Sequence, residues 1–342
     1  MLFKRTVLNI CKRTKRRTVS YIIAILSVLL ILRCIINILP PASVNNEEYL
    51  HHFRRNRSLE HYLNNIEEKT NPFKPCGNQG SVPVVVLVSS ASSNERQRDI
   101  IRSTWGRYQP TFFVLGMNES NPSIHFMTKT MFEFKMFDDL IIYSFPDHYQ
   151  NLTLKTALMM QWTLQRCPQA KFMLKIDDDV LLIPWRLTDI IAASENQSLV
   201  GDKIKNAPAH RDPYNKYYLP RWLHYEDYIP EYLNGNAYLI NMRHLKQIFE
   251  AAKKVPLINL EDVYFTSLVA SRTLGLNLTH DKRFSPIRPM YPVQCVYWNL
   301  ATIHGVRLEV MPRVWDMLEN YNEDVQKNVS FAFVQKICPL LT

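Results

Sequence analysis

The chain has 342 residues, of which 46% are hydrophobic, 11% aromatic and 21% charged, a composition typical of globular proteins and unlike that of disordered or fibrous chains. Its formal net charge is +10, but residues 1–40 hold eight Lys/Arg and no Asp or Glu, so the other 302 residues carry 33 basic and 31 acidic side chains. The excess positive charge therefore belongs to the N-terminus, and the charge of the body does not favour nucleic-acid binding.

The first predicted element is a membrane-spanning helix at residues 21–39, with the sequence YIIAILSVLLILRCIINIL. A helix of that length rises about 28 Å, close to the roughly 30 Å of a bilayer core. Basic residues precede it, so the positive-inside rule predicts a cytosolic tail at residues 1–20 and a lumenal body. The alternative is a cleaved signal peptide, whose apolar core would be shorter and would end in small residues. We expect a retained type II signal-anchor.

Sequons and cysteines after the span agree with a lumenal body. Asn-x-Ser/Thr sequons, each a potential N-glycosylation site, begin at Asn56, Asn118, Asn151, Asn196, Asn277 and Asn328. Four cysteines also follow the span: Cys76, Cys167, Cys295 and Cys338. An even number fits two disulfides in an oxidising compartment, with three possible pairings, and buried free thiols are the alternative.

The rest of the chain reads as a stem followed by one domain. Residues 40–80 are polar and rich in turn signals, which predicts a lumenal stem, partly helical around Tyr49–Lys69. Within residues 81–342, apolar β-branched runs predict strands at Val84–Ser89, Thr111–Leu115, Asp139–Ser144 and Lys171–Ile176. Helical spacing predicts helices at Asn94–Trp105, capped by Asn94, and at Thr153–Gln165. Strands alternating with helices indicate an α/β fold with a mostly parallel central sheet.

Three consecutive aspartates, Asp177, Asp178 and Asp179, follow the fourth predicted strand directly. Ligands of open α/β sheets bind at the carboxyl ends of strands, and adjacent carboxylates repel one another unless a cation offsets their charge. Hard carboxylate oxygens suit Mg²⁺ or Mn²⁺, ions that often share their ligands with substrate phosphates. The triplet therefore suggests a metal-bridged nucleotide diphosphate, and a solvated acidic turn is the alternative.

Three further positions are candidates for chemistry. Glu261 and Asp262 open a helical stretch, where a carboxylate serves either as a helix cap or as a general base. His304 is a lone histidine after an apolar stretch, either packed or a metal ligand. Gly235 lies between two aromatic-flanked segments, where it forms a turn or lets a sugar approach the backbone closely.

Taken together, the motifs resemble the β-1,3-galactosyltransferase family, glycosyltransferase family 31, over roughly residues 84–310. Each motif is short, but their order and approximate spacing match those of the family. The matching stretches include Arg98–Trp105, Phe113–Gly116, Asn151–Thr156, Lys175 with Asp177–Val180, Lys216–Tyr218, Pro230–Tyr232 and Glu261–Tyr264.

The resemblance implies a GT-A-like fold and an inverting transfer of galactose from UDP-galactose, in β-1,3 linkage, to a sugar of a glycoprotein or glycolipid. It implies a Golgi membrane location and Mn²⁺ as the cofactor. By resemblance, Asp262 is the catalytic base, with Glu261 beside it, and Asp179 and His304 are the metal ligands. The resemblance assigns substrate binding to Arg98, Arg102, Trp105, Asp177, Asp178 and Gly235.

The sequence departs from the family pattern at two places. A Gly-rich run is replaced by Leu233–Ala237, and Thr266 stands where the family often has glycine after the acidic pair. These departures concern donor or acceptor preference, since the acidic triplet and pair remain. Two alternatives to galactose transfer stay open: transfer of N-acetylglucosamine from UDP-GlcNAc, and a catalytically silent, membrane-anchored glycan-binding protein.

Overall fold

The computed structural model describes residues 53–73, 75–76, 82–117, 124–289 and 293–326, together with Tyr21, Ala24, Ile25, Ser27 and Val28. The strands are β1 (Glu68–Thr70), β2 (Val82–Ser89), β3 (Thr111–Gly116), β4 (Leu140–Tyr143), β5 (Ala170–Asp177), β6 (Val180–Leu182), β7 (Leu199–Ile204), β8 (Ala207–Pro208), β9 (Tyr228–Ile229), β10 (Tyr232–Asn241), β11 (Leu278–His280), β12 (Phe284–Ser285) and β13 (Thr302–His304).

The α-helices are α3 (Leu59–Leu63), α4 (Glu95–Ser103), α5 (Ile124–Phe137), α6 (Leu152–Arg166), α7 (Pro184–Ala193), α8 (Met242–Ala252), α9 (Gln294–Trp298) and α10 (Met311–Gln326). Two 3₁₀ turns, η1 (Trp105–Arg107) and η2 (Tyr149–Asn151), and a π-helix, η3 (Val263–Thr273), complete the described elements. The four predicted strands and two predicted helices all occur, with ends that differ by at most a few residues.

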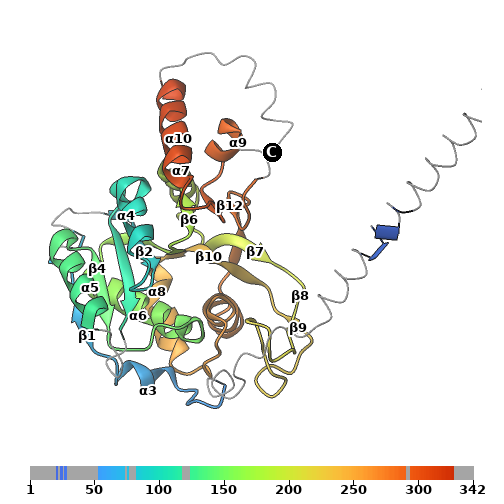
Figure 1. Cartoon of the computed structure of the whole chain (residues 1–342). Helices are drawn as coiled ribbons and strands as arrows, with labels where there is room; N and C mark the ends of the chain where they lie inside the picture. Colours follow the sequence, from blue (N-terminus) through green and yellow to red (C-terminus); the bar gives the residue numbers. More distant parts are fainter. Residues whose placement is uncertain are drawn as a thin grey trace, which may run out of the picture.

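An eight-stranded sheet in the order β1-β4-β3-β2-β5-β10-β7-β11 forms the centre of the described part of the chain (Figure 1). Its four central strands, β4, β3, β2 and β5, run parallel as expected. The sheet as a whole is mixed, because β1, β5 and β7 have antiparallel neighbours. β10 begins at the carboxyl end of β5 and runs back along it, pairing Ala237 with Ile176 and Asn241 with Phe172. β7 is in turn antiparallel to β10, and β11 is parallel to β7, so six of the eight strands run in one direction and only β1 and β10 oppose them. The sheet is therefore mixed but mostly parallel, as predicted.

Both faces of the sheet are buried, which explains why β2 is apolar at almost every position. Val85 and Leu87 belong to one hydrophobic cluster, together with side chains of α6 and α8. Val84, Val86 and Val88 belong to a second cluster, together with side chains of α4, α7 and α10. Alternate residues of a strand point to opposite faces, so a strand covered on both sides reads as a continuous apolar run.

The described part of the predicted stem packs on the domain. α3 lies within the range predicted to be helical, and β1 pairs with the edge strand β4 instead of continuing the helix. A disulfide joins Cys76 to Cys167, directly after α6. Cys295 is also disulfide-bonded, whereas Cys338 lies outside the described residues. Residues 53–73 and 75–76 therefore pack on the folded body, and the boundary at residue 80 stays a prediction.

Among the described residues, none of the helices is long and apolar enough to cross a membrane. The predicted span at residues 21–39 lies almost entirely outside them, as do the sequons at Asn118 and Asn328. Three other sequon asparagines, at positions 56, 196 and 277, are exposed. Asn151 is buried, and its side-chain nitrogen donates a hydrogen bond to the Pro146 carbonyl at 2.8 Å, so its amide is not available to a glycan in the folded chain.

Candidate active site

The topology gathers the predicted acidic residues at one edge of the main sheet. β2 and β5 pair in parallel up to Ser89 and Asp177, so the loop after β2 meets the acidic triplet after β5. In the smaller sheet β12-β13-β6, the register pairs Val180 with His304, and this places His304 beside Asp179. The return strand β10 then carries Gly235 and Asn236 to the same edge, next to the start of η3.

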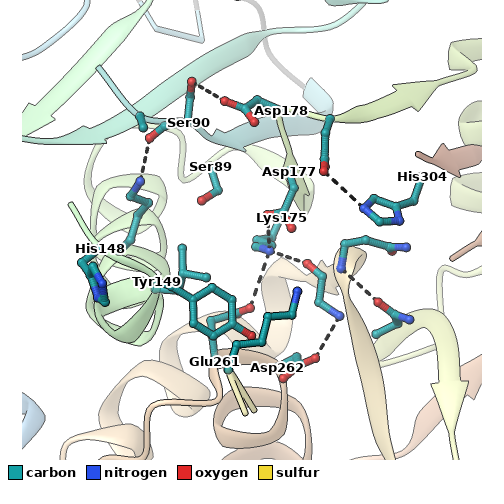
Figure 2. Close-up of a pocket in the computed structure, with 18 of the residues that line it drawn as sticks. Ser89, Ser90, His148, Tyr149, Lys175, Asp177, Asp178, Glu261, Asp262 and His304 are labelled. Carbon is teal, nitrogen blue, oxygen red and sulfur yellow. Dashed lines mark hydrogen bonds and ion pairs between the residues drawn. The ribbon is translucent and has the colours of Figure 1, made fainter. Parts of the chain in front are cut away.

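These elements enclose a cavity of about 580 Å³ (Figure 2). Its lining is mainly polar and comes from segments far apart in the sequence. The lining side chains that the following argument uses are Ser90, Asn94, Tyr149, Lys155, Lys175, Asp177, Asp178, Asp179, Lys216, Tyr217, Gly235, Asn259, Glu261, Asp262 and His304.

Asp179 and His304 form a contact pair at the rim of this cavity. The His304 Nε2 atom lies 3.2 Å from Asp179 Oδ2, and its Nδ1 atom lies 3.0 Å from the Pro286 carbonyl oxygen. Burial tends to raise the pKa of Asp179, but the hydrogen bond and charge of His304 outweigh it and lower that pKa. The same hydrogen bond raises the pKa of His304. The pair that the resemblance assigns to metal binding is thus brought together.

Asp178 ties the acidic triplet to the loop after β2. Its Oδ2 atom accepts hydrogen bonds from Ser90 Oγ at 2.7 Å and from Asn94 Nδ2 at 2.9 Å. Asn94 precedes α4, as predicted, but its side chain does not cap that helix and binds Asp178 instead. Arg98 supports this loop from behind, because it donates to Ser90 Oγ at 3.1 Å and forms two bonds with Glu133.

Lys175 joins the two acidic motifs. Its ammonium group is buried in β5 and lies 2.6 Å from Asp177 Oδ1 and 3.6 Å from Glu261 Oε2 (Figure 2). Lys175 also donates to the Gly235 carbonyl. Burial tends to lower the pKa of Lys175, but the charges of Asp177 and Glu261 raise it overall and keep the side chain positively charged. A single cation thus holds the triplet, β10 and the acidic pair together.

Glu261 is the more enclosed member of the acidic pair. One oxygen faces Lys175, and the other accepts a hydrogen bond from the Tyr238 hydroxyl. Burial raises the pKa of Glu261 to about 7 in spite of the positive charge of Lys175. Both oxygens are therefore engaged by protein groups.

Asp262 is the less enclosed member, and backbone groups hold it. Its Oδ1 atom accepts from Val263 N at 2.8 Å, and its Oδ2 atom accepts from Gly235 N at 3.1 Å. A carboxylate oxygen accepts more than one hydrogen bond, so each retains a position for a substrate hydroxyl. Burial raises the pKa of Asp262, which increases its affinity for a proton. Of the two neighbouring carboxyl groups, Asp262 is the more exposed to the cavity.

Gly235 and Asp262 lie so close together that a larger residue at position 235 would displace the Asp262 side chain. A Cβ atom added at Gly235 would lie 3.0 Å from Asp262 Oδ2 and 3.2 Å from Asp262 Cβ. The group that approaches Gly235 here is a protein carboxylate, and the approach of a sugar to this glycine stays a prediction. Thr266, at the position where the family often has glycine, donates to the Asp262 carbonyl at 2.6 Å and accepts from Leu233 N at 2.9 Å. It thereby fastens β10 to η3.

Two predicted substrate-binding residues lie away from the cavity. Arg102 is held by Asp139, Glu133 and Asp99, with distances of 2.7 Å to the first two carboxylates. Trp105 is fully buried in the second hydrophobic cluster. Neither is among the lining residues, and Arg98 reaches the cavity only through the loop that contains Ser90. The shared motif around α4 therefore supports the loop after β2, and the positions of Arg102 and Trp105 do not favour the expectation that they bind substrate directly.

Several lining residues were not predicted as site residues from the sequence. Tyr149, Lys216 and Tyr217 form an aromatic and cationic wall, with the Lys216 ammonium 4.6 Å from the Tyr217 ring centroid. Lys155 donates to the Ser90 carbonyl at 2.6 Å and pairs with Asp147 at 2.7 Å. A lysine within an apolar helix face is the signal that points to Lys155, whereas no local pattern separates Tyr149 from other surface tyrosines.

The residues present fit a divalent cation that completes its coordination with substrate. Asp179 and His304 supply one carboxylate and one imidazole, and both side chains are partly exposed to the cavity, at 58% and 41%. Within the described residues, no group of three or more His, Cys, Asp or Glu is arranged to hold a metal ion. Asp179 and His304 are thus the residues of this cavity whose chemistry suits a divalent ion.

Comparison with known proteins agrees with the motif order. Residues 96–281 match the family model described as Galactosyltransferase. Human beta-1,3-galactosyltransferase 1 is 29% identical over 244 residues, covering 68% of this chain and 73% of the relative. Human N-acetyllactosaminide beta-1,3-N-acetylglucosaminyltransferase 4 is 30% identical over 262 residues, covering 72% and 67%. A solved glycosyltransferase that acts in glycosylation of the major capsid of PBCV-1 aligns over 68% of this chain and 98% of its own, with 14% identity and a TM-score of 0.38.

Proposed function

Because the chain belongs to the galactosyltransferase family, we propose that this glycosyltransferase moves galactose from UDP-galactose to an acceptor sugar on a glycoprotein or glycolipid, in β-1,3 linkage and with inversion. The observation that carries the proposal is the cavity itself, which combines an exposed Asp179–His304 pair with a backbone-held carboxylate, Asp262. In the proposed assignment, the Asp179–His304 pair would bind the diphosphate side of the donor, and Asp262 would receive a proton from the acceptor.

In the proposed reaction, Asp262 accepts the proton of the acceptor hydroxyl while that oxygen attacks the anomeric carbon. The bond from the anomeric carbon to the β-phosphate oxygen breaks on the opposite side, and the electron pair leaves with UDP. In Figure 2, Asp262 lies at the lower edge of the lining residues, Asp178 at the upper edge and His304 on the right. A base and a leaving-group site on separate sides of one cavity suit an in-line displacement, which inverts the anomeric carbon. One base is sufficient, in contrast to the carboxylate pair of a glycosidase.

We propose Mn²⁺ as the cofactor, with Asp179 and His304 as its protein ligands. When bound, such an ion supplies Lewis-acid stabilisation of the charge that develops on the leaving diphosphate. Asp178 keeps the triplet in place through its bonds to Ser90 and Asn94. Asp177 is fixed by Lys175, so the triplet is already oriented before any ligand arrives.

Transfer of N-acetylglucosamine from UDP-GlcNAc is the second candidate, and the relative that is 30% identical favours it. We also propose that the catalytic domain has a GT-A-like fold. We further propose that the protein is a Golgi membrane enzyme of type II topology, which the apolar stretch at residues 21–39 and its basic flank support.

A panel of UDP-galactose, UDP-GlcNAc and UDP-GalNAc tests the proposal. The purified protein is incubated with each donor and Mn²⁺, and release of UDP is measured with and without an acceptor glycoside. We expect UDP-galactose to give the highest rate. A preference for UDP-GlcNAc would favour the second candidate, and absence of metal-dependent turnover with every donor would leave only a glycan-binding protein.

Two substitutions separate the proposed roles of the acidic residues. Asp262→Asn is expected to lower kcat by about a hundredfold or more, because the general base is lost, while UDP binding survives. Asp179→Ala is expected to abolish Mn²⁺-dependent binding of UDP in calorimetry, because one of two protein ligands is removed. Transfer by Asp262→Asn at the parent rate, or unchanged metal-dependent binding by Asp179→Ala, would contradict the respective assignment.

A further inference from the structure

Asn236 lines the cavity of the candidate active site, and its carboxamide is not satisfied there by protein groups. The residue is 7% exposed, and both polar atoms of the side chain, Nδ2 and Oδ1, are buried. Within the part of the chain that the structure describes, neither atom has a hydrogen-bond partner. Leaving a buried donor and a buried acceptor unpaired is costly, so this side chain points to a partner other than the described residues.

A bulge in β10 positions this side chain. The register of β10 against β7 shifts between Leu233 and Tyr238, so β10 carries extra residues there, and Asn236 is among them. Bulges re-aim side chains and are frequent next to active sites. The bulge coincides with Leu233–Ala237, the stretch that departs from the Gly-rich pattern of the family. The carboxamide is therefore a feature that a Gly-rich run would lack.

The neighbouring Asn234 shows how protein groups satisfy a carboxamide in the same bulge. Its Oδ1 atom accepts a hydrogen bond from Asn236 N at 3.2 Å, and its side chain also bonds Asp202. Gly235, between the two asparagines, donates its N–H to Asp262 at 3.1 Å. The backbone of the bulge is thus fixed by the protein, whereas the Asn236 carboxamide keeps both of its polar atoms for a ligand.

Asn236 lies between the two halves of the proposed reaction centre. Ala237 pairs with Ile176 of β5, and one step further along the two strands come Asn236 and Asp177, the first residue of the acidic triplet. The residue before Asn236 contacts Asp262, the proposed base. In the proposed reaction, the transferred sugar joins the diphosphate to the acceptor, so its ring occupies the space between the triplet and the base. The sugar of the donor is therefore the part of the substrate closest to Asn236.

A carboxamide with an unpaired donor and an unpaired acceptor suits two neighbouring hydroxyl groups. Nδ2 donates to one hydroxyl oxygen while Oδ1 accepts from the other hydroxyl. A trans amide, such as an N-acetyl group, presents its N–H and C=O on opposite sides, so one carboxamide meets only one of them. An apolar group would leave both atoms unpaired. The chemistry therefore favours the hydroxyl-bearing part of a hexose.

We propose that Asn236 is a specificity-determining residue that binds two adjacent hydroxyl groups of the transferred hexose. The inference rests on the proposed function, because that function places a sugar nucleotide in this cavity. UDP alone lacks the hexose, so Asn236 contributes to binding of the sugar nucleotide and does not contribute to binding of UDP.

Calorimetry with UDP-galactose and with UDP, each in the presence of Mn²⁺, tests this role in the full chain. Asn236→Ala is expected to bind UDP-galactose about tenfold more weakly than the parent, as for loss of two hydrogen bonds, and to bind UDP unchanged. UDP-GlcNAc replaces UDP-galactose if the donor panel favours it. Because the substitution removes two unpaired buried atoms, urea unfolding is expected to show a stability equal to or above that of the parent. A merely structural role would lower the stability.

Ser267→Ala is the matched control. The Ser267 hydroxyl is also buried and has no hydrogen-bond partner among the described residues, but Ser267 does not line the cavity. This variant is expected to bind UDP and UDP-galactose as the parent does. Equal affinities of Asn236→Ala and the parent for UDP-galactose would overturn the inference, as would an equal weakening for UDP. A higher KM for the acceptor with unchanged affinity for UDP-galactose would assign the carboxamide to the acceptor and overturn it too.

Binding by the parent separates this inference from the proposed function. If the parent binds neither UDP nor a UDP-sugar in the presence of Mn²⁺, the proposed function fails, and the role of Asn236 fails with it. If the parent binds the UDP-sugar and Asn236→Ala binds it equally well, the inference alone fails and the proposed function stands.

Discussion

At the scale of single residues, burial sets the chemistry of the acidic pair. Glu261 is 5% exposed, and Asp262 beside it is less enclosed, so two neighbouring carboxyl groups have different surroundings. Lys175 and Tyr238 occupy the oxygens of Glu261, whereas backbone N–H groups orient those of Asp262. This difference supports Asp262 as the proton acceptor and Glu261 as a positioning residue that keeps Lys175 and β10 in place.

The raised pKa of Glu261 predicts a pH-dependent stability. A carboxyl group whose pKa rises on folding contributes stability that is complete at low pH and is lost as pH rises from its ordinary pKa of 4.5 to about 7. Glu261→Gln removes this contribution. The parent is therefore expected to lose roughly 3 kcal/mol more than Glu261→Gln in its free energy of unfolding across that interval. Urea unfolding of the parent and of Glu261→Gln at a series of pH values measures this difference in the free energy of unfolding.

Other acids with raised pKa values, including Asp177 and Asp262, titrate in the same direction, so the comparison between parent and variant isolates Glu261. Glu60→Gln, at an exposed position on α3, serves as the control for loss of a carboxylate. Parallel stability curves for the parent and Glu261→Gln would contradict the assigned pKa.

Local sequence located the carboxylates but not their partners. The triplet and the acidic pair were recognisable because charged residues follow directly on apolar segments. Lys175 appeared only as part of a shared motif, and its position between Asp177 and Glu261 depends on β10 and η3. Likewise, Arg102 and Trp105 belong to a shared motif, yet they stabilise α4 and the core.

At the scale of elements, the contact between β10 and η3 positions Asp262, the proposed base. Gly235 N and the Thr266 hydroxyl connect the strand to Asp262. η3 is a π-helix, a form that proteins use rarely and often at functional sites. A π-helix widens the backbone turn, and here its first residue follows the proposed base directly.

Gly235→Ala is expected to lower activity more than stability. The added Cβ would lie 3.0 Å from Asp262 Oδ2, so the carboxylate has to move away from the position that it occupies in the parent. A displaced general base is expected to cost about tenfold to a hundredfold in kcat. Initial-rate measurements and thermal unfolding of the same samples test this.

Gly275→Ala is the reciprocal control. An added Cβ there meets nothing within 4 Å, but its φ of +66° is unfavourable for alanine, so stability is expected to fall by about 1 kcal/mol while kcat stays unchanged. If Gly235→Ala retains parent kcat, the close approach of Asp262 to β10 is unimportant for transfer.

At the scale of the whole molecule, the segment before the sheet supports the active site. Arg55 donates to the Gln150 carbonyl at 2.8 Å and to Asn259 Oδ1 at 3.3 Å, and it also bonds Asn151. Asn259 lines the cavity, and Gln150 lies next to Tyr149, which lines it too. Burial lowers the pKa of Arg55 to about 10, so the side chain remains charged at neutral pH.

Arg55→Ala is expected to lower the free energy of unfolding by about 2 to 3 kcal/mol, because buried acceptors in two loops lose a charged donor. The same change is expected to reduce kcat, since both loops border the cavity. Arg96→Ala is the matched control, because its side chain is 68% exposed and its ion pair with Glu309 is 4.0 Å long. Equal unfolding midpoints for the two variants would show that the N-terminal segment does not brace the site.

The sequence by itself determined the α/β class, the order of the first strands and helices, and the two acidic motifs. Each of these depends on periodicity and residue type within short stretches, and local backbone preferences express them directly. Only the tertiary structure decided the direction of β10, the meeting of Asp179 with His304 across 125 residues, and the packing of the supposed stem on the domain. These features arise from burial and long-range pairing, for which the lowest free energy depends on the whole chain and not on any single segment.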